Sequence, residues 1–277
     1  MCIKSLKRNK SCGSDNIFNE YIKGSSEYML PLYHKLFNKI FDSGVFPSNW
    51  LCGQIIPLYK NKGNTKDPKN YRPITLLSCI GKMFTSILNE RLNVYANQSN
   101  LILENQAGFR KNHSTTDHIF VLHMIIELFK ISKKQLYCAF IDYEKAFDSV
   151  WRVGLWNKIL LNGNIDGKCF RIIYNMYNGI KAQIKFNGDL SEKFSCQLGV
   201  RQGENLSPFL FSIYLNDLES FLETNKIEGL QHISELLLNE LQMYEKLILM
   251  FYADDTIIFA ESPEKVTKRF NLFRGIL

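Results

Sequence analysis

Two adjacent carboxylates near the end of the chain, Asp254 and Asp255, have the types and spacing to do chemistry. They stand between two apolar, β-prone runs, 247–253 and 256–260, which predicts a strand, a tight turn with both acids at its tip, and a second strand. Two unit charges about 4 Å apart repel by roughly 4 kcal/mol at an effective dielectric of 20. A fold that places a third carboxylate beside this pair needs either a bound cation or a raised pKa of a carboxyl group. Adjacent Asp residues are also ordinary turn formers, so both readings stay open for the pair alone.

A third carboxylate, Asp142, follows a nearly all-apolar run, 136–141, which predicts a strand buried at a central position of a sheet. Asp is also common at strand ends and in turns, so this residue alone does not define a site. If the strand end and the acidic turn lie side by side, three carboxylates meet. Oxygen ligands of this kind hold a pair of Mg²⁺ ions without His or Cys.

A third segment, residues 199–208 (GVRQGENLSP), has features of a ligand-binding loop. Gly203 allows close approach of the backbone to a ligand, and Gln202 offers an amide to a base or sugar edge. Ser207 and Pro208 predict a helix start, with Ser at the N-cap and Pro at the first helical position. The N-terminus of that helix favours phosphate, although a plain capped helix after a loop is the alternative.

Composition limits the class of protein. The 277 residues are 45% hydrophobic and 22% charged, which excludes a disordered chain. The net charge of +7 is compatible with a polyanionic partner and equally with none. Seven scattered cysteines without C-x-x-C spacing suggest neither a disulfide framework nor a zinc site, and favour a reducing intracellular setting. We identify no signal peptide and no apolar run approaching the roughly 18 residues of a membrane span.

The elements that must position these residues are of mixed type, which predicts the α+β class. A hairpin is expected over 181–197, turning at Asn187 and Gly188, and Ser114 with Asp117 resembles a capping box. Residues 226–246 read as an uncertain, partly helical connection. Apolar residues at helical spacing predict further helices over 29–41 (ending at Gly44), 80–92, 115–129, 151–162 and 167–178, and from 262 onward.

Taken in order, these motifs resemble those of reverse transcriptases, specifically of non-LTR (LINE-like) retrotransposons. The palm motifs are residues 140–148 (FIDYEKAFD), 201–211 (RQGENLSPFLF) and 251–255 (FYADD). Earlier segments match as well: 70–82 (NYRPITLLSCIGK), 89–92 (NERL) and 105–119 (NQAGFRKNHSTTDHI). The resemblance runs from about residue 13 to about residue 273. Any one motif would be weak, but several in the family's order make coincidence very improbable.

The resemblance implies a right-hand polymerase fold: fingers and palm, with a small antiparallel palm sheet packed on helices. Residues 1–135 would be mainly fingers with a lead-in, and 136–277 mainly palm. The palm motif regions would be 137–152, 199–222 and 247–260, with a fingers-like insertion at about 163–198. The family's next palm motif, primer grip and thumb are not found, so we expect a truncated fragment of a longer protein.

The family's roles carry over residue by residue. The resemblance implies that Asp142, Asp254 and Asp255 are catalytic and bind two Mg²⁺ (or Mn²⁺) ions, with the backbone carbonyl of Tyr143 as a further ligand. Phe147 would be the bulky gate that rejects a ribose 2′-hydroxyl. Expected to bind the nucleotide or template are Arg72, Arg110, Gln202 and Gly203.

The activity implied is RNA-directed DNA synthesis, in which a dNTP is added to a primer 3′-hydroxyl by two-metal nucleotidyl transfer. Expected partners are an RNA template, a DNA primer and dNTPs, with no membrane. The missing thumb and an endonuclease domain would belong to the same polyprotein. The expected location is intracellular: the nucleus at the point of use, or a cytoplasmic ribonucleoprotein.

Two alternatives stay open. One is a reverse transcriptase of the group II intron or telomerase kind; the other is a non-catalytic remnant that binds nucleic acid or nothing. One departure from the family pattern is Glu204 and Asn205, where many relatives carry Cys and Pro.

Overall fold

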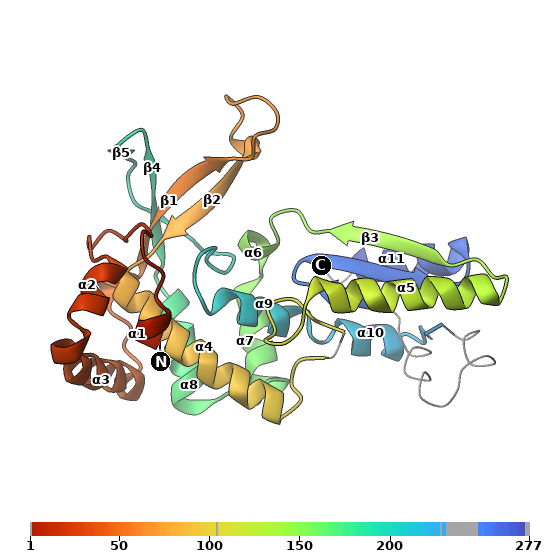
Figure 1. The fold of residues 1–277 in the computed structure, drawn as a ribbon, viewed down its shortest axis with the longest axis horizontal. Coiled ribbons are helices and arrows are strands. Elements are labelled where there is room, and N and C mark those ends of the chain that lie inside the picture. Colours follow the sequence, from red (N-terminus) through yellow and green to blue (C-terminus); the bar gives the residue numbers. More distant parts are fainter. Residues whose placement is uncertain (1, 104, 228, 231–248, 275–277) are drawn as a thin grey trace. The chain divides into compact units, whose positions relative to one another are not determined.

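The computed structural model describes residues 2–103, 105–227, 229–230 and 249–274 (Figure 1). The chain forms two compact units. Unit 1 contains residues 1–101 and 147–210, and unit 2 contains residues 102–146 and 211–277. Each unit is therefore built from two separate stretches of sequence. The chain passes between the units three times: after residue 101 in a loop, within helix α6 (Ala146–Ser149) and within helix α9 (Ser207–Leu215).

Unit 1 combines helices with a sheet in which β1 and β4 are parallel and the other pairs are antiparallel. The strand order is β2-β1-β4-β5, and β6 also pairs with β4. The strands are β1 (Cys52–Tyr59), β2 (Tyr71–Leu76), β4 (Lys181–Phe186), β5 (Asp189–Leu190) and β6 (Phe194–Ser195). The helices are α1 (Cys2–Ser5), α2 (Asn19–Gly24), α3 (Ser26–Ser43), α4 (Cys79–Gln98), α7 (Arg152–Leu161) and α8 (Gly167–Tyr177), with short 3₁₀ turns η1 (Ser48–Trp50) and η2 (Pro68–Asn70).

Local sequence signals predicted two boundaries in unit 1 correctly. Helix α3 ends where predicted, at Gly44, whose φ of 70° is the left-handed conformation that glycine adopts at a helix C-terminus. The β4–β5 hairpin turns at Asn187 (φ 51°) and Gly188 (φ 96°), the two-residue turn that matches strand twist. The predicted hairpin is confirmed there.

Unit 2 is built on a three-stranded antiparallel sheet of order β3-β8-β7 (Figure 1). Helix α5 packs on this sheet, and α11 contacts β3 and β8. A buried core joins α5 to the strands through Ile125, Phe129, Met250 and Phe259. The elements are α5 (Thr115–Ile131), β3 (Tyr137–Asp142), α10 (Leu218–Thr224), β7 (Leu249–Tyr252), β8 (Asp255–Ala260) and α11 (Pro263–Arg274).

The start of α5 confirms the predicted capping box. The side chain of Ser114 accepts from the backbone of the third helical residue, and Asp117 Oδ2 accepts from Ser114 N at 2.7 Å. The mixed α+β class is confirmed as well. No helix in the described part of the chain is long and apolar enough to cross a membrane.

Three sequence predictions need correction. Strand β3 lies at the edge of its sheet, not at a central position, and Phe140 is 72% exposed; the central strand is β8. The second acid of the pair, Asp255, begins β8 and is not at the tip of the turn. Helix α9 begins at Ser207 itself, so this residue is not the N-cap. A run of apolar residues indicates that a strand is buried, but not which strands pair with it. This explains why β3 was predicted at a central position. The expected partly helical connection over 226–246 lies mostly outside the described residues.

The predicted division at residue 135 does not coincide with the compact units, which change at 101, 146 and 210. The assignment of segments to fingers and palm stays a prediction.

Candidate active site

Asp142 and Asp255 are directly opposed on neighbouring strands. In the antiparallel pairing of β3 with β8, the last residue of β3 faces the first residue of β8, so Asp142 pairs with Asp255. Directly opposed residues have Cβ atoms about 4.5–5.5 Å apart and point to the same face of the sheet. Asp255 also pairs with Tyr252 across the β7–β8 turn. Two of the three predicted catalytic acids are therefore neighbours at one end of the unit 2 sheet.

Asp254 occupies the turn between β7 and β8. Tyr252 and Asp255 close this turn as a pair, so Ala253 and Asp254 are its two central residues. Ala253 has a φ of 60°, a left-handed conformation that favours glycine. The turn thus places Asp254 directly beside the strand end that carries Asp255.

The charges at this end of the sheet affect one another. The pKa of Asp255 is raised, first by burial and then by the negative charges of Asp254 and Asp142. This effect requires both other carboxylates to be close enough for repulsion to be felt. The raised pKa of Asp255 is consistent with the expected repulsion among the three carboxylates.

The three acids do not form a closed metal cage. No group of three His, Cys, Asp or Glu side chains among the described residues converges into a metal-binding cluster. Asp142 and Asp255 are exposed and Asp254 is half-buried. Their donors are all carboxylate oxygens, which suit Mg²⁺ or Mn²⁺, and open sites of few carboxylates are typical for Mg²⁺ that also contacts substrate phosphates. The residues present fit such an ion in chemistry, as an open site.

Tyr143 follows Asp142 in the sequence, and its side chain packs against α11. Its ring lies 5.9 Å from the ring of Phe273 on α11, and burial raises the pKa of its hydroxyl. The predicted role of its backbone carbonyl as a metal ligand stays a prediction.

The loop that contains Gln202 and Gly203 lies in unit 1. Hydrogen bonds hold both its backbone and the Gln202 side chain. Gln202 Nε2 donates to Asp148 Oδ2 at 3.0 Å, and Thr75 N on β2 donates to Gln202 O at 3.3 Å. Gly203 has a φ of 98°, and a Cβ there would lie 2.8 Å from Thr75 O. Only glycine fits this close approach to β2, which is the structural reason for the Gln-Gly sequence.

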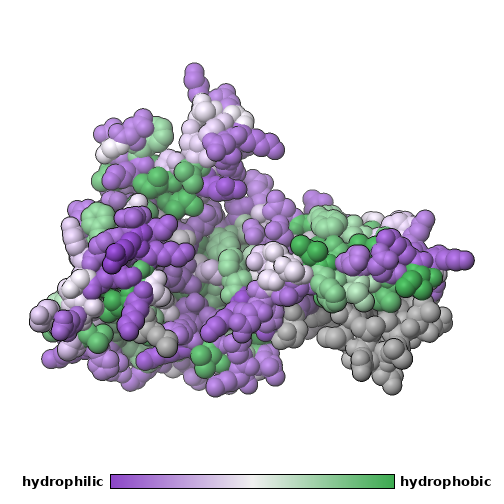
Figure 2. Space-filling model, in the orientation of Figure 1, coloured by the Kyte–Doolittle hydropathy of each residue, from purple (hydrophilic) through white to green (hydrophobic). Residues whose placement is uncertain are grey.

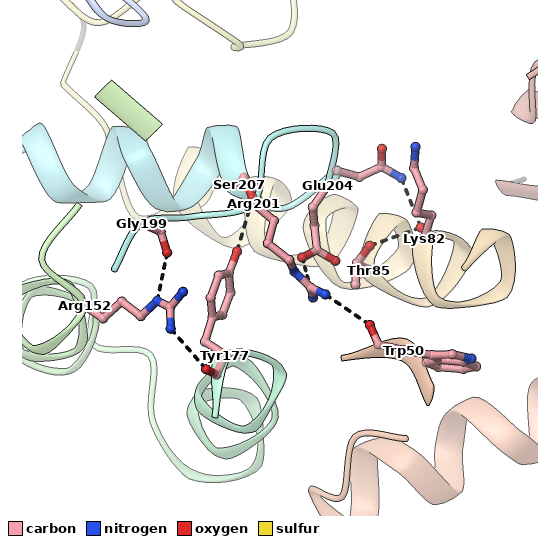
Figure 3. A network of polar contacts seen from close by, with 10 residues as sticks. Trp50, Lys82, Thr85, Arg152, Tyr177, Gly199, Arg201, Glu204 and Ser207 are labelled. Carbon is pink, nitrogen blue, oxygen red and sulfur yellow. Dashed lines mark hydrogen bonds and ion pairs between the residues drawn. The ribbon is translucent and has the colours of Figure 1, made fainter. Parts of the chain in front are cut away.

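A buried ion pair fixes the backbone on both sides of Gln202 and Gly203 (Figure 3). Arg201 Nη2 lies 2.7 Å from Glu204 Oε2, and both side chains are less than a tenth exposed. Arg201 Nη1 also donates to Trp50 O at 3.1 Å, and the guanidinium lies 5.7 Å from the Tyr177 ring centroid. Glu204 is therefore the ion-pair partner of the arginine in the same motif.

Neighbouring groups complete this network (Figure 3). The Tyr177 hydroxyl lies 3.2 Å from Ser207 Oγ, and burial raises its pKa. The Arg152 guanidinium donates to the carbonyls of Gly199 at 2.8 Å and Cys196 at 2.8 Å, which ties down the start of the loop. Asn205 Nδ2 donates to Lys82 O at 3.0 Å.

The remaining predicted substrate-binding residues have different surroundings. Arg72 is exposed on β2, opposite Leu58. Phe147 is half-buried in unit 1, and its carbonyl accepts from Val200 N at 2.7 Å. Arg110 is half-buried in unit 2, where its Nη1 donates to Leu103 O at 2.9 Å and Gln106 O at 3.4 Å. Their substrate contacts stay predictions.

Two residues beside the acidic turn were not assigned a role from the sequence. The buried side chain of Gln106 accepts from Ala253 N at 3.2 Å. The His118 ring on α5 lies edge-on to Tyr252, with centroids 6.2 Å apart, and burial lowers its pKa. Gln106 belongs to the NQAGFR segment (residues 105–110) that resembles the family. The resemblance did not indicate a role for this residue.

Comparison with known proteins finds a matching family and several relatives. The family profile described as reverse transcriptase (RNA-dependent DNA polymerase) matches residues 59–276. The chain is 29% identical over 217 residues to the probable RNA-directed DNA polymerase from transposon BS of Drosophila melanogaster, covering 78% of this chain and 24% of that protein. It is 27% identical over 253 residues to the probable RNA-directed DNA polymerase from transposon X-element of the same species, covering 90% and 25%.

A third relative is the RNA-directed DNA polymerase from mobile element jockey of Drosophila melanogaster, 26% identical over 271 residues, covering 94% of this chain and 26% of that protein. The chain spans about a quarter of the length of these relatives. Among solved structures, apo telomerase from Candida tropicalis, truncated from the C-terminal domain, matches with a TM-score of 0.54 at 14% identity. That match covers 98% of this chain and 55% of the telomerase chain, and shows a shared fold.

The family profile covers well over half of the chain and includes the strand end of Asp142, the Gln202–Gly203 loop and the acidic turn. The chain therefore belongs to the reverse transcriptase family, and the relatives it matches in sequence are RNA-directed DNA polymerases of non-LTR retrotransposons.

Proposed function

We propose that this chain is the catalytic portion of a non-LTR retrotransposon reverse transcriptase, which adds dNTPs to the 3′-hydroxyl of a DNA primer on an RNA template. The observation that carries the proposal is the pairing of Asp142 with Asp255 on adjacent strands, with Asp254 in the adjoining turn. Such a concentration of negative charge is costly unless cations neutralise it during the reaction.

The acids would act by holding divalent cations. Asp142, Asp254 and Asp255, with the Tyr143 carbonyl, are the proposed ligands for two Mg²⁺ or Mn²⁺ ions. When bound, such ions lower the pKa of an attacking hydroxyl and stabilise a leaving pyrophosphate. The protein's own contribution is to hold the carboxylates on a rigid sheet, so that little reorganisation is needed at the moment of reaction.

The nucleotide-binding roles are proposed for unit 1 residues and for Arg110. Gln202 and Gly203 are assigned to the nucleotide and template because their loop is fixed on both sides by the Arg201–Glu204 pair. Phe147 is assigned as the sugar gate, and Arg72 and Arg110 as triphosphate contacts. The exposed position of Arg72 is consistent with that assignment.

Partners and location follow from the proposed reaction. The template is RNA, the primer is DNA, and further segments of the same polyprotein, including a thumb and an endonuclease, would assist the chain. The proposed location is intracellular, in the nucleus during target-site synthesis or in a cytoplasmic ribonucleoprotein.

Metal-dependent incorporation of dTTP on poly(rA) primed with oligo(dT) tests the proposal. We expect Asp254→Asn to lower the rate by about 10²–10³-fold, the scale lost when one electrostatic stabiliser is removed. The matched control is Asp189→Asn, which makes the same change at an exposed residue of β5 in unit 1 and is expected to leave the rate unchanged.

Absence of incorporation, both by this chain and by a longer protein that includes the proposed thumb, would overturn the proposal. That result would favour the non-catalytic remnant.

A further inference from the structure

The segment that precedes α5 forms an extra strand-like contact along β7, the outer strand of the three-stranded sheet. Gln106 forms a parallel bridge with Phe251, Phe251 N donates to Asn105 O at 2.8 Å, and Ala107 N donates to Phe251 O at 3.1 Å. These three contacts bring residues 105–108 alongside the last residues of β7. The segment therefore lies against the turn that carries Asp254.

Gly108 confirms how closely the segment approaches this turn. A Cβ on Gly108 would lie 2.0 Å from Ala253 N, a distance that real Cβ atoms do not reach. The atom it would meet is backbone, which cannot rotate away as a side chain can. Only glycine allows this contact.

The conformation of Ala253 makes the turn dependent on outside support. The left-handed region is unfavourable for a residue with a Cβ, so Ala253 does not hold this conformation without cost. Ala253 is also only 6% exposed, so its N–H needs a partner within the protein. Without one, the N–H would be an unpaired buried donor, which is costly. Gln106 Oε1 accepts this N–H at 3.2 Å.

Gln106 is itself an unusual residue to bury. It is 3% exposed, and its Oε1 accepts a second hydrogen bond from Gly108 N at 2.9 Å. Two backbone donors on one atom fix that atom as the oxygen of the amide. The other end, Nε2, is buried and has no hydrogen-bond partner among the residues that the structure describes, which is an unfavourable arrangement for an amide donor. The fold thus keeps a buried polar side chain for its oxygen alone.

We propose that Gln106 is a positioning residue for the acidic turn: its side-chain oxygen holds the Ala253 N–H and so fixes the backbone from which Asp254 and Asp255 extend. The proposal rests on the function proposed above, because the purpose of the fixed turn is to present carboxylates to divalent cations. The proposed role of Gln106 involves no contact with substrate, because the residue acts only through the turn.

The test compares Gln106→Met, which keeps the length and removes the acceptor, with Gln106→Glu, which keeps an acceptor oxygen. The control is Asn19→Ala, which removes another buried amide, one that donates to Lys7 O at 2.8 Å in unit 1. Circular dichroism and thermal unfolding identify any variant that has lost its fold.

Three readouts are applied to the full chain. Hydrogen exchange of peptides covering residues 249–256 reports on the turn directly, and Mn²⁺ titration followed by electron paramagnetic resonance reports on cation binding. Primer extension gives kcat, the KM for dTTP and the Mg²⁺ dependence. The first two do not require polymerase activity, so they test this proposal even if the proposed function fails.

For Gln106→Met we expect exchange in the turn to be at least about 10-fold faster, Mn²⁺ affinity and kcat to fall by about 10–100-fold, and KM for dTTP to stay nearly constant. Gln106→Glu is expected to recover much of each loss. Unchanged exchange and Mn²⁺ affinity in Gln106→Met would overturn the proposal. So would equal losses in Gln106→Met and Asn19→Ala, since those would indicate general destabilisation.

Discussion

The charge on Asp255 links stability to pH at the level of one residue. Its pKa is raised above the ordinary 3.8, by burial first and then by Asp254 and Asp142. A carboxyl with a raised pKa in the folded state loses its proton more readily in the unfolded chain. Ionisation of Asp255 therefore destabilises the folded chain, and this loss develops as the pH rises from the ordinary pKa through the raised one.

We accordingly expect Asp255→Asn to be more stable than the wild type at neutral pH in EDTA, and equally stable well below the ordinary pKa. The gain in melting temperature should be small, on the order of 1 °C, because Asp255 is exposed to solvent. Thermal melts from acid to neutral pH measure the difference. A variant that is less stable at neutral pH, or a difference that does not change with pH, would contradict the assignment.

Phe147 carries the prediction about sugar selection. If its ring excludes a ribose 2′-hydroxyl, Phe147→Ala should raise the ratio of ribonucleotide to deoxyribonucleotide incorporation, by about 10-fold or more if the lost repulsion is worth about 1.4 kcal/mol. The measurement is kcat/KM for UTP and dTTP on the same template. Leu161→Ala, an exposed apolar residue that ends α7, serves as the control. An unchanged ratio in an active Phe147→Ala protein would remove the gate assignment.

The residues that the sequence could identify are those whose role is local. Asp142, Asp254 and Asp255 each stand at a strand end or turn that their own neighbours predict. Gln106 could not be found this way, because its partner Ala253 is 147 residues away and no periodicity connects them. The same reason explains why β3 was expected at the centre of its sheet, since pairing partners are set by the fold and not by the strand's own composition.

Among the elements, the loop of residues 201–205 depends on a buried ion pair. Arg201 and Glu204 form a buried pair whose atoms lie 2.7 Å apart. Removing one member of such a pair leaves a buried, uncompensated charge, which costs about 3–5 kcal/mol. Replacing both members by apolar residues of similar size is often nearly neutral.

A double-mutant cycle tests this at the loop. We expect Arg201→Met and Glu204→Leu each to lower the free energy of unfolding by about 3–5 kcal/mol, and the double variant to recover most of that loss. Urea unfolding measures each value. Strictly additive losses would show that the two side chains do not depend on each other.

Three short-range signals were the most predictable features of the fold. Gly44, the Asn187–Gly188 turn and the Ser114–Asp117 capping box are short-range signals, and each is found where it was expected. The division of the chain into units could not be predicted, because each unit joins two stretches that are distant in sequence.

At the scale of the whole molecule, positive charge and exposed apolar surface indicate where nucleic acid could bind. The space-filling view shows hydrophobic residues at the surface of unit 2 over β3 and α5 (Figure 2). The exposed apolar side chains of these two elements include Phe140, Ile119 and Phe120. In unit 1, the loop between β1 and β2 is exposed throughout residues 60–69 and carries Lys60, Lys62, Lys66 and Lys69. The overall charge of +7 favours a polyanion without identifying it.

Salt dependence can separate the contribution of this lysine loop from that of net charge. Each phosphate that a protein neutralises on a duplex contributes about −0.9 to the slope of log K against log salt. If Lys62 and Lys66 contact the template–primer backbone, changing both to Gln should make the slope less steep by about 1–2.

The matched control changes Lys35 and Lys39, exposed residues of α3, to Gln and removes the same charge. Fluorescence anisotropy with a labelled RNA–DNA duplex over a range of salt concentrations measures both slopes. A change confined to the loop variant would locate phosphate contacts there, whereas equal changes in both variants would mean that net charge alone attracts the nucleic acid.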